Sequence, residues 1–113
     1  MRSDLYCVYI LSSSTRVLYV GCTSDLNRRM FQHKHGLLPG FTKRYRVTRL
    51  VWYDCTPNVA AAVTREREIK GWSREAKIRL IESTNRGWLD LAADWFPDMR
   101  EQDPSPSLRS GSG

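Results

Sequence analysis

The stretch that decides the fold of this chain runs from Val17 to His33 and reads VLYVGCTSDLNRRMFQH. Its first residues, 17–22, are rich in β-branched and aromatic side chains and predict a strand. Ser24 is a good N-cap and predicts that a helix begins directly afterwards. Along that helix Arg29 and His33 stand four residues apart, so they project from one side. A strand that leads through a glycine into a helix with two basic side chains suggests a phosphate-binding site.

A second strand is predicted upstream, over residues 6–11 (YCVYIL), with a polar turn between the two. A hairpin centred on Ser14 places Tyr9 opposite Tyr19. Because side chains alternate between the faces of a strand, both tyrosines share one face with Gly21. The other face is the predicted core face and carries Val8, Ile10, Leu18 and Val20. The tyrosine face is either a floor for a ligand or an aromatic pair that only stabilises the sheet.

The predicted helix ends before Gly36 and buries Leu26 and Met30. Arg29 and His33 follow those residues on the same flank. A cation on the packed side of a helix is costly without a partner. Arg29 is therefore either half of a structural salt bridge or part of a site. His33 is either a satisfied, partly buried histidine or part of the same site.

Residues 36–46 (GLLPGFTKRYR) predict a glycine- and proline-containing loop that ends in a basic and aromatic segment. In that segment the cations Lys43, Arg44 and Arg46 alternate with the aromatic residues Phe41 and Tyr45. Such mixing suits phosphate contacts combined with base stacking. A solvated loop with two anchoring aromatic residues explains the pattern equally well. Residues 49–55 then predict a third strand.

A second helix is predicted from the Thr56-Pro57 pair to Lys70, because proline is favoured at the first helical position. Its predicted apolar stripe consists of Val59, Ala62, Val63 and Ile69. Helical spacing places Glu66 inside this stripe and Glu68 on the opposite side. A carboxylate in a buried seam needs a cation, which is either a metal ion or an arginine such as Arg29.

The remainder of the chain predicts two further segments and a tail. Gly71 ends the second helix, and Ser73 caps a third helix that runs to Glu82 and packs Ile78 and Ile81 inward. Residues 85–96 predict an apolar cover formed by Trp88, Leu89, Leu91, Ala92 and Trp95. Residues 97–113 are rich in proline, serine and glycine and predict a disordered tail. Residues 1–96 therefore form one predicted domain.

The composition narrows the class of protein. The chain has 113 residues, a net charge of +6 and a sequence pI of about 9.6, which favours a polyanionic partner such as nucleic acid. Three cysteines without a CxxC spacing indicate neither a disulfide framework nor a zinc site. No apolar run is long enough to span a bilayer, and no signal peptide is visible. We therefore expect no membrane partner and a cytoplasmic location.

In chain order, Tyr9, the Tyr19-Val20-Gly21 triplet, Arg29, His33 and Glu66 resemble the motifs of the GIY-YIG nuclease superfamily. The chain looks most like the small, single-domain members related to the N-terminal domain of UvrC. The triplet Cys7-Val8-Tyr9 stands where the family has GIY, with a cysteine in place of the first glycine. The resemblance implies an α+β fold, with a small, mainly antiparallel three-stranded sheet flanked by helices in the order strand-strand-helix-strand-helix-helix.

The resemblance also implies a metal-dependent endonuclease that hydrolyses DNA phosphodiester bonds, with single-stranded or structured DNA favoured. Glu66 would hold Mg²⁺ or Mn²⁺, and Arg29 would bind the scissile phosphate. Tyr9, supported by Tyr19, would activate water once nearby cations depress its pKa, or His33 would take the proton itself. Contacts with nucleic acid are expected from Gly21, Lys43, Arg44 and Arg46. The alternative is a catalytically silent nucleic-acid-binding or adaptor domain, and the oligomeric state stays open.

Overall fold

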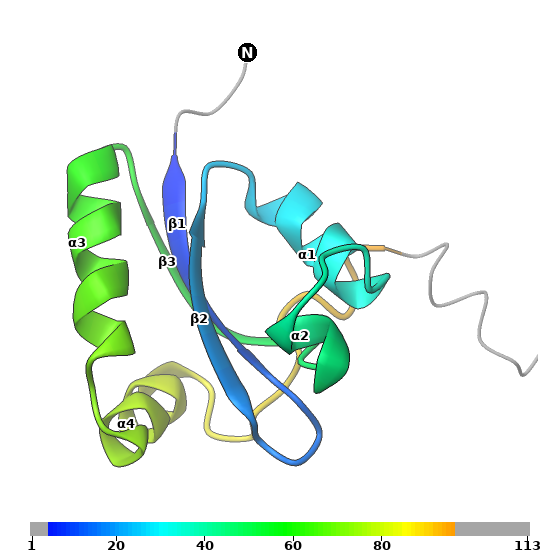
Figure 1. Cartoon of the computed structure of the whole chain (residues 1–113). Helices are drawn as coiled ribbons and strands as arrows, with labels where there is room; N and C mark the ends of the chain where they lie inside the picture. The colour runs from blue at the N-terminus through cyan, green and yellow to red at the C-terminus, as the bar shows by residue number, and fades with distance from the viewer. Residues whose placement is uncertain (1–4, 97–113) are drawn as a thin grey trace, which may run out of the picture.

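In a computed structural model of the protein, residues 5–96 are described, and the predicted tail over 97–113 lies outside them. Two strands come first, β1 (Tyr6–Ser12) and β2 (Leu18–Thr23). Two helices follow, α1 (Leu26–Lys34) and the short α2 (Phe41–Arg44). The third strand, β3 (Arg49–Thr56), precedes α3 (Val59–Lys70) and α4 (Arg74–Thr84). Figure 1 shows α3 and α4 on one side of the sheet and α1 and α2 on the other.

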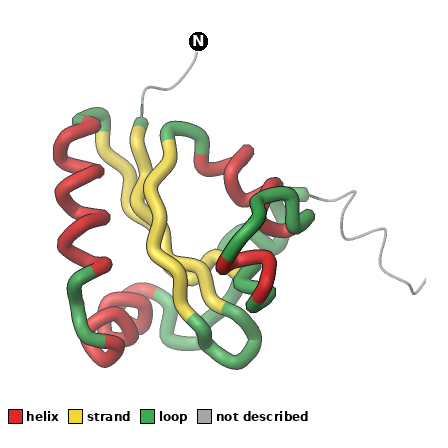
Figure 2. Tube along the Cα trace, in the orientation of Figure 1, coloured by secondary structure: helices red, strands yellow, loops and turns green. Residues whose placement is uncertain are grey.

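The strands form one antiparallel sheet with the order β2-β1-β3, so β1 is the central strand (Figure 2). The predicted α+β class and the three-stranded sheet are confirmed. The predicted element order has no counterpart of α2, because the sequence predicts a loop and a basic and aromatic segment over residues 36–46. Gly36 and Gly40 adopt positive φ angles of 65° and 104°, which favour glycine and allow sharp turns of the chain. The short helix α2 begins directly after Gly40 and ends before β3.

Both faces of the sheet are buried, because helices cover each of them. The core on the α3 and α4 side includes the buried residues Val8, Ile10, Val20, Val51, Trp52, Ala62, Ile69, Ile81 and Trp88. The core on the α1 side consists of Tyr9, Leu11, Met30, Val47, Leu50 and Ala92. The predicted core face is confirmed. The tyrosine face is a second core face, so of the two alternatives that the sequence left open, the structure favours aromatic side chains that stabilise the sheet over an open floor.

The predicted register of the hairpin is wrong by two residues. Tyr9 pairs with Gly21, and Leu11 pairs with Tyr19. The turn is centred one residue later than Ser14, because the Ser13 backbone N–H donates to the Val17 carbonyl at 3.0 Å. Since the shift is an even number of residues, each side chain stays on its predicted face.

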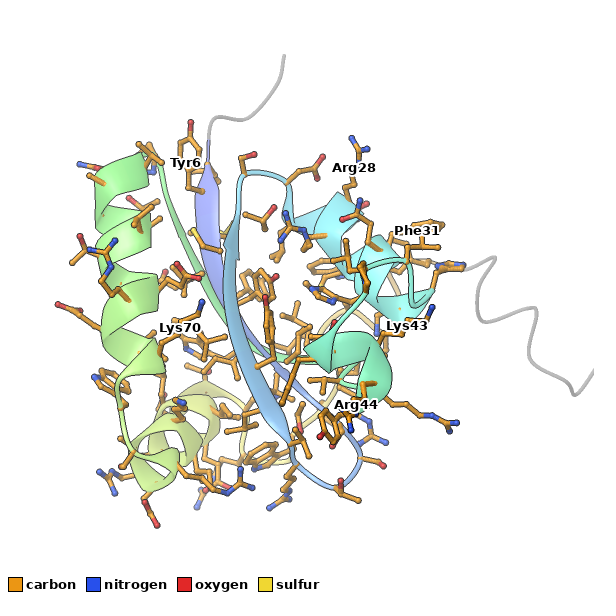
Figure 3. The ribbon with its side chains drawn as sticks, viewed as in Figure 1. Tyr6, Arg28, Phe31, Lys43, Arg44 and Lys70 are labelled. Carbon is orange, nitrogen blue, oxygen red and sulfur yellow. A yellow bond between two sulfur atoms is a disulfide. The ribbon has the colours of Figure 1, made fainter. Side chains whose placement is uncertain are left out.

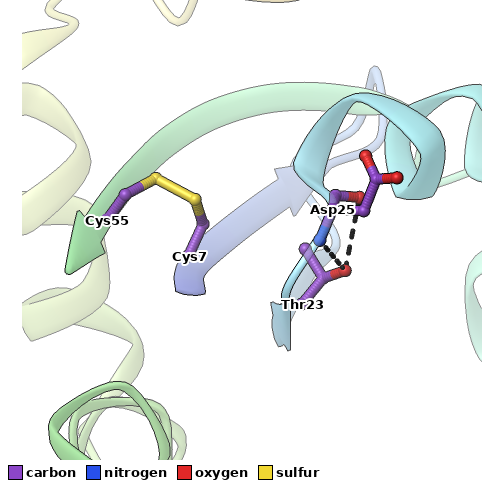
Figure 4. The surroundings of a disulfide bond; sticks show 4 residues. All are labelled: Cys7, Thr23, Asp25 and Cys55. Carbon is purple, nitrogen blue, oxygen red and sulfur yellow. Dashed lines mark hydrogen bonds between the residues drawn. A yellow bond between two sulfur atoms is a disulfide. The ribbon is translucent and has the colours of Figure 1, made fainter. Parts of the chain in front are cut away.

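The first helix begins one residue later than predicted. Asp25 is its N-cap in place of Ser24, and the Asp25 carboxylate accepts a hydrogen bond from the Arg28 backbone N–H at 3.1 Å. Thr23 explains why Asp25 and not Ser24 is the N-cap. The Thr23 hydroxyl accepts a hydrogen bond from the Asp25 backbone N–H at 3.0 Å and holds Asp25 at the turn between β2 and α1 (Figure 4). The helix was predicted to run to His35, and it ends one residue earlier, at Lys34, with His35 as its C-cap ahead of Gly36.

Helix α3, which is the second helix predicted from the sequence, also begins later than predicted. Asn58 is its N-cap, with the side-chain oxygen accepting from the Ala61 backbone N–H at 3.0 Å. Pro57 therefore precedes the helix, and Thr56 ends β3. At the other end Gly71 caps α3 and Ser73 caps α4, both as predicted.

Several predicted core positions are exposed. Val59 and Val63 are 51% and 38% exposed, because the row of α3 that faces the sheet runs through Ala62 and Ile69 and leaves both valines at its flank. In the C-terminal cover, Trp88 and Ala92 are buried as predicted, whereas Leu89 and Leu91 are exposed. No helix in the described part of the chain is both long and apolar enough to cross a bilayer.

Two of the cysteines, Cys7 and Cys55, form a disulfide bond (Figure 4). The interpretation that no disulfide is present was wrong. Cys7 on β1 lies directly opposite Cys55 on β3, and spacing along the chain cannot reveal this pairing between strands. Cys22 on β2 is the free cysteine of the described residues.

Candidate active site

The phenol of Tyr9 is the centre of the candidate site. Its side chain is buried on the α1 side of the sheet and crosses the neighbouring strand at Gly21. A Cβ atom at position 21 would lie only 2.4 Å from Tyr9 Oη and 2.5 Å from Cζ. Only glycine leaves room for the Tyr9 ring in this place. Gly21 was predicted as a nucleic-acid contact, and in the structure it makes space for Tyr9.

Two side chains from α1 reach the Tyr9 hydroxyl. His33 Nε2 lies 3.2 Å from Tyr9 Oη, and Arg29 Nη1 donates a hydrogen bond to the same oxygen at 3.5 Å. Arg29 and His33 are one helical turn apart, so a single helix face supplies both groups. The helix thus turns a local spacing in the sequence into a three-residue hydrogen-bonded cluster.

Tyr19 lies beside this cluster on β2. Its ring centroid is 6.3 Å from that of Tyr9 and 5.8 Å from that of His33. On its other side Tyr19 stacks on Phe41 of α2, with centroids 6.3 Å apart and an interplanar angle of 26°. Tyr19 therefore connects the buried cluster to the surface of α2.

The protonation states in the cluster differ from those that the sequence suggested. Burial raises the pKa of Tyr9 to about 12, although the hydrogen bond from Arg29 opposes the shift. Burial, followed by the charge of Arg29, lowers the pKa of His33 to about 4. His33 is thus neutral at pH 7 and cannot act as the cation that depresses the pKa of Tyr9. Of the cations expected to depress the pKa of Tyr9, Arg29 acts in that direction and His33 does not, so these side chains leave a neutral phenol beside a neutral imidazole.

Glu66 lies on the sheet-facing row of α3. Its side chain is 21% exposed and forms an ion pair with Lys70 Nζ at 3.0 Å, one turn further along the helix. Of the two cations that the sequence left open for Glu66, Arg29 is not its partner, since the arginine hydrogen-bonds Tyr9. The charge of Glu66 contributes to the raised pKa of both Tyr9 and Cys22, which places the carboxylate near both strands. Lys70 lies between α3 and the sheet in Figure 3.

The donor atoms near Glu66 restrict which metal ions could be held there. Over residues 5–96 no group of three or more His, Cys, Asp or Glu side chains could hold an ion. A zinc site needs three or four such ligands and does not fit. Mg²⁺ often takes one carboxylate and fills its remaining positions with water and substrate phosphate oxygens, so a partly exposed Glu66 fits an ion of this type.

The predicted basic and aromatic segment forms a groove on α2. Its volume is about 730 Å³, and it is lined by Pro39, Gly40, Phe41, Lys43, Arg44 and Tyr45. Phe41 and Tyr45 are each 45% exposed and lie 4.9 Å apart between ring centroids. Figure 3 shows Lys43 and Arg44 on this helix. Arg46 is exposed and follows with a positive φ of 55°.

Two further residues of the site were missed in the sequence. Thr42 of α2 is buried, and its Oγ1 lies 3.1 Å from His33 Nδ1. No local pattern marks a threonine in that segment as a partner of His33. Lys70 is the ion-pair partner of Glu66, and the i, i+4 spacing of the two residues could have revealed it.

Comparison with known proteins is consistent with this geometry. Residues 5–79, which contain Tyr9, Tyr19, Arg29, His33 and Glu66, match the GIY-YIG catalytic domain. The chain therefore belongs to the GIY-YIG catalytic domain family, and the resemblance found in the sequence is confirmed.

The most similar relatives include small proteins of the group named UPF0213. One from Haloquadratum walsbyi is 38% identical over 80 residues, which cover 71% of this chain and 90% of that protein. One from Staphylococcus aureus is 37% identical over 79 residues, or 70% of this chain and 96% of the relative. The solution NMR structure of a UPF0213 protein from Bacillus halodurans covers 80% of this chain and 97% of that chain, with a TM-score of 0.52 and 27% identity.

Proposed function

We propose that this protein is a divalent-metal-dependent endonuclease that hydrolyses phosphodiester bonds in DNA. The observation that carries the proposal is the convergence of Arg29 and His33 on the hydroxyl of Tyr9. Membership of the GIY-YIG catalytic domain family supports the same reaction. The net charge of +6 suits a polyanionic substrate.

Arg29 is the proposed phosphate ligand. Its guanidinium has five N–H donors, and the contact with Tyr9 uses one nitrogen, so other donors are available for phosphate oxygens. A guanidinium fixed in this way stabilises charge that develops on the phosphate during the reaction.

Tyr9 and His33 are the proposed proton carriers. With a pKa of about 12, Tyr9 keeps its proton at neutral pH, so it can accept a proton from water only as it gives its own proton to another group. The nearest acceptor is the neutral His33 Nε2, at 3.2 Å. As the water attacks phosphorus, its proton passes to Tyr9 Oη while the phenolic proton passes to His33 Nε2. The Tyr19 ring packs beside both Tyr9 and His33.

Glu66 is the proposed ligand of Mg²⁺ or Mn²⁺. Such an ion supplies positive charge that stabilises the leaving oxygen of the phosphodiester. The ion pair with Lys70 engages Glu66 Oε2, so the lysine would have to release this oxygen if an ion is to use both carboxylate oxygens. Lys70 Nζ would then be free to contact a phosphate.

The groove on α2 is the proposed path of the DNA strand. Lys43 and Arg44 would contact phosphates, with Arg46 beside them, and the exposed faces of Phe41 and Tyr45 would stack on bases. Paired bases in a duplex have their faces covered, so this groove favours single-stranded or structured DNA.

A second candidate function is a catalytically silent domain that only binds nucleic acid. The observation in its favour is the Glu66–Lys70 ion pair, which engages one oxygen of the carboxylate proposed for the metal ion. Such a domain would bind DNA in a salt-sensitive way and yield no metal-dependent product.

A cleavage panel distinguishes the two functions. Single-stranded, duplex and flap DNA and an RNA strand are each incubated with Mg²⁺, Mn²⁺ or a chelator. We expect cleavage of DNA that Glu66→Gln abolishes and that Glu68→Gln, at an exposed carboxylate on the same helix, preserves. Mn²⁺ binding, followed by electron paramagnetic resonance, should fall in the first variant alone. Cleavage by Glu66→Gln at the parent rate contradicts the assignment, and salt-sensitive binding without cleavage in any metal favours the silent domain.

A further inference from the structure

Thr42 forms a polar contact that the proposed mechanism does not yet use. It lies in the middle of α2, and its side chain is buried, with 6% of the residue exposed. Its hydroxyl reaches His33 Nδ1 at 3.1 Å, on the opposite side of the imidazole from Tyr9. His33 itself is 5% exposed, so water has little access to either ring nitrogen.

The hydrogen-bond directions around His33 depend on its tautomer. A neutral imidazole has one N–H donor and one acceptor nitrogen. If Nδ1 carries the proton, it donates to Thr42 Oγ1, and Nε2 accepts from the Tyr9 hydroxyl. If Nε2 carries the proton, it donates to Tyr9 Oη, and the Thr42 hydroxyl donates to Nδ1. Only the first arrangement leaves a lone pair on Nε2 facing the phenolic proton.

Arg29 of α1 bears on the tautomer through Tyr9. It acts only as a donor and donates to Tyr9 Oη in both arrangements, so in the second arrangement the phenolic oxygen accepts from Arg29 and from His33 at once. The Tyr9 proton then has no acceptor among the hydrogen bonds of the described residues, which favours the first arrangement. Tyr19 of β2 contributes the edge and face of a ring. On α2 the Thr42 hydroxyl faces Nδ1, and it supplies the acceptor that Nδ1–H needs in the first arrangement.

We propose that Thr42 is a positioning residue that holds His33 in the tautomer protonated at Nδ1, so that Nε2 receives the phenolic proton of Tyr9. The proposal rests on the proposed function for its catalytic consequence, although the tautomer itself is a property of the resting protein. When Nε2 gains the proton, Thr42 Oγ1 still accepts from Nδ1–H, and the imidazolium keeps a partner on that side.

The position of Thr42 also links the imidazole to the groove. Its neighbours Phe41 and Lys43 line the groove on α2, while Thr42 points into the protein. A DNA strand that binds in the groove therefore contacts the same helical turn that positions His33. Loss of the hydroxyl should lower the rate of the chemical step and leave substrate binding largely intact.

The test compares Thr42→Val, which keeps the shape of threonine without its hydroxyl, with Thr42→Ser, which keeps the hydroxyl. The tautomer is measured by long-range ¹H–¹⁵N NMR at pH 7 on metal-free protein without DNA. The chain has two histidines, so a His35→Gln background assigns the signals of His33. We expect Nδ1–H in the parent and in Thr42→Ser, and Nε2–H in Thr42→Val, because a buried Nδ1–H without an acceptor is costly.

Single-stranded DNA cleavage with Mg²⁺ is then measured for the same proteins. We expect Thr42→Val to lower kcat roughly tenfold or more with little change in KM, and Thr42→Ser to restore most of the rate. An Nε2–H tautomer in the parent overturns the proposal whether or not the valine variant folds. An unchanged tautomer and an unchanged kcat in Thr42→Val overturn it as well. A tautomer change without cleavage by any variant, the parent included, supports the positioning role and contradicts the proposed nuclease function instead.

Discussion

At the scale of single residues, the site depends on a glycine at position 21, because glycine has no side chain. Gly21 lies opposite Tyr9 across the β1–β2 pair, and the Tyr9 ring occupies the space that a Cβ would take. The same contact sets the position of Tyr9 Oη between His33 and Arg29. A close approach of this kind couples the strand pairing to the geometry of the hydrogen bonds.

Gly21→Ala should therefore displace the Tyr9 ring and break its contact with His33. Forcing an extra methyl group into packed space costs roughly 1–3 kcal/mol. We expect a loss of stability of that size in urea unfolding, together with a loss of DNA cleavage. Gly87→Ala is the control, because a Cβ there meets Leu89 Cγ at 3.8 Å, which is ordinary contact. Equal effects of the two substitutions would contradict this interpretation of Gly21.

His33 should make the stability of the protein depend on pH. Its pKa is lowered from 6.5 to about 4, so the unfolded chain takes up a proton at a higher pH than the folded protein does. Stability is therefore present above pH 6.5 and is lost as the pH falls towards 4, by on the order of 3 kcal/mol. Urea unfolding at several pH values measures the slope. His33→Gln should lack this part of the slope, and an identical slope in the variant would show that His33 is not the cause.

At the scale of elements, α2 has two functions in the proposed site. Its inner face holds Thr42 against His33, and its outer face carries the cations and aromatic rings of the groove. Phe41, which lines the groove, stacks on Tyr19 of β2. A helix of only four residues thus joins the proposed substrate path to the buried cluster.

Removing an aromatic face of the groove should weaken DNA binding. We expect Tyr45→Ala to reduce the affinity for a single strand by about 1–3 kcal/mol, the usual contribution of one stacked base. The loss should be smaller for a duplex, whose bases are already stacked. Fluorescence anisotropy with labelled oligonucleotides measures both affinities. Arg79→Ala, on the exposed surface of α4 across the sheet, should have little effect, and an equal loss there would refute the groove.

Local periodicity accounts for most of what the sequence predicted correctly. The alternation of β1 and β2 placed Tyr9 and Tyr19 on one face, and helical spacing placed Arg29 beside His33. Neither result needs information from distant parts of the chain. The choice of Asp25 over Ser24 as N-cap depended on a hydrogen bond to Thr23, which is a detail of three-dimensional geometry.

Contacts between distant segments could not be predicted in this way. Thr42 reaches His33 because α2 folds back over α1, and Cys7 meets Cys55 because β3 pairs with β1. The exposure of Val59 and Val63 has a similar origin, since the rotation of α3 against the sheet decides which row of the helix is buried.

At the scale of the whole molecule, the disulfide ties the central strand to an edge strand across 48 residues of sequence. By the chain-entropy estimate, closing a loop of this length stabilises the folded state by about 4 kcal/mol. We expect a reducing agent to lower the free energy of unfolding by up to this amount, as measured in urea. The double variant Cys7→Ser, Cys55→Ser should reproduce the loss and no longer respond to reduction. If the reducing agent still lowers the free energy of unfolding in the double variant but no longer does so in Cys22→Ser, the effect comes from Cys22 and the account of the disulfide is contradicted.

The central claim is that the Tyr9 hydroxyl, held by Arg29 and His33, takes part in breaking the phosphodiester bond. Tyr9→Phe removes this one oxygen and keeps the buried ring. The most direct measurement is the single-turnover rate of DNA cleavage with Mg²⁺ by this variant, with circular dichroism to confirm its fold. We predict a rate at least about 100-fold below that of the parent protein, the usual size of a general acid–base contribution. A folded Tyr9→Phe protein that cleaves at the parent rate would contradict the claim.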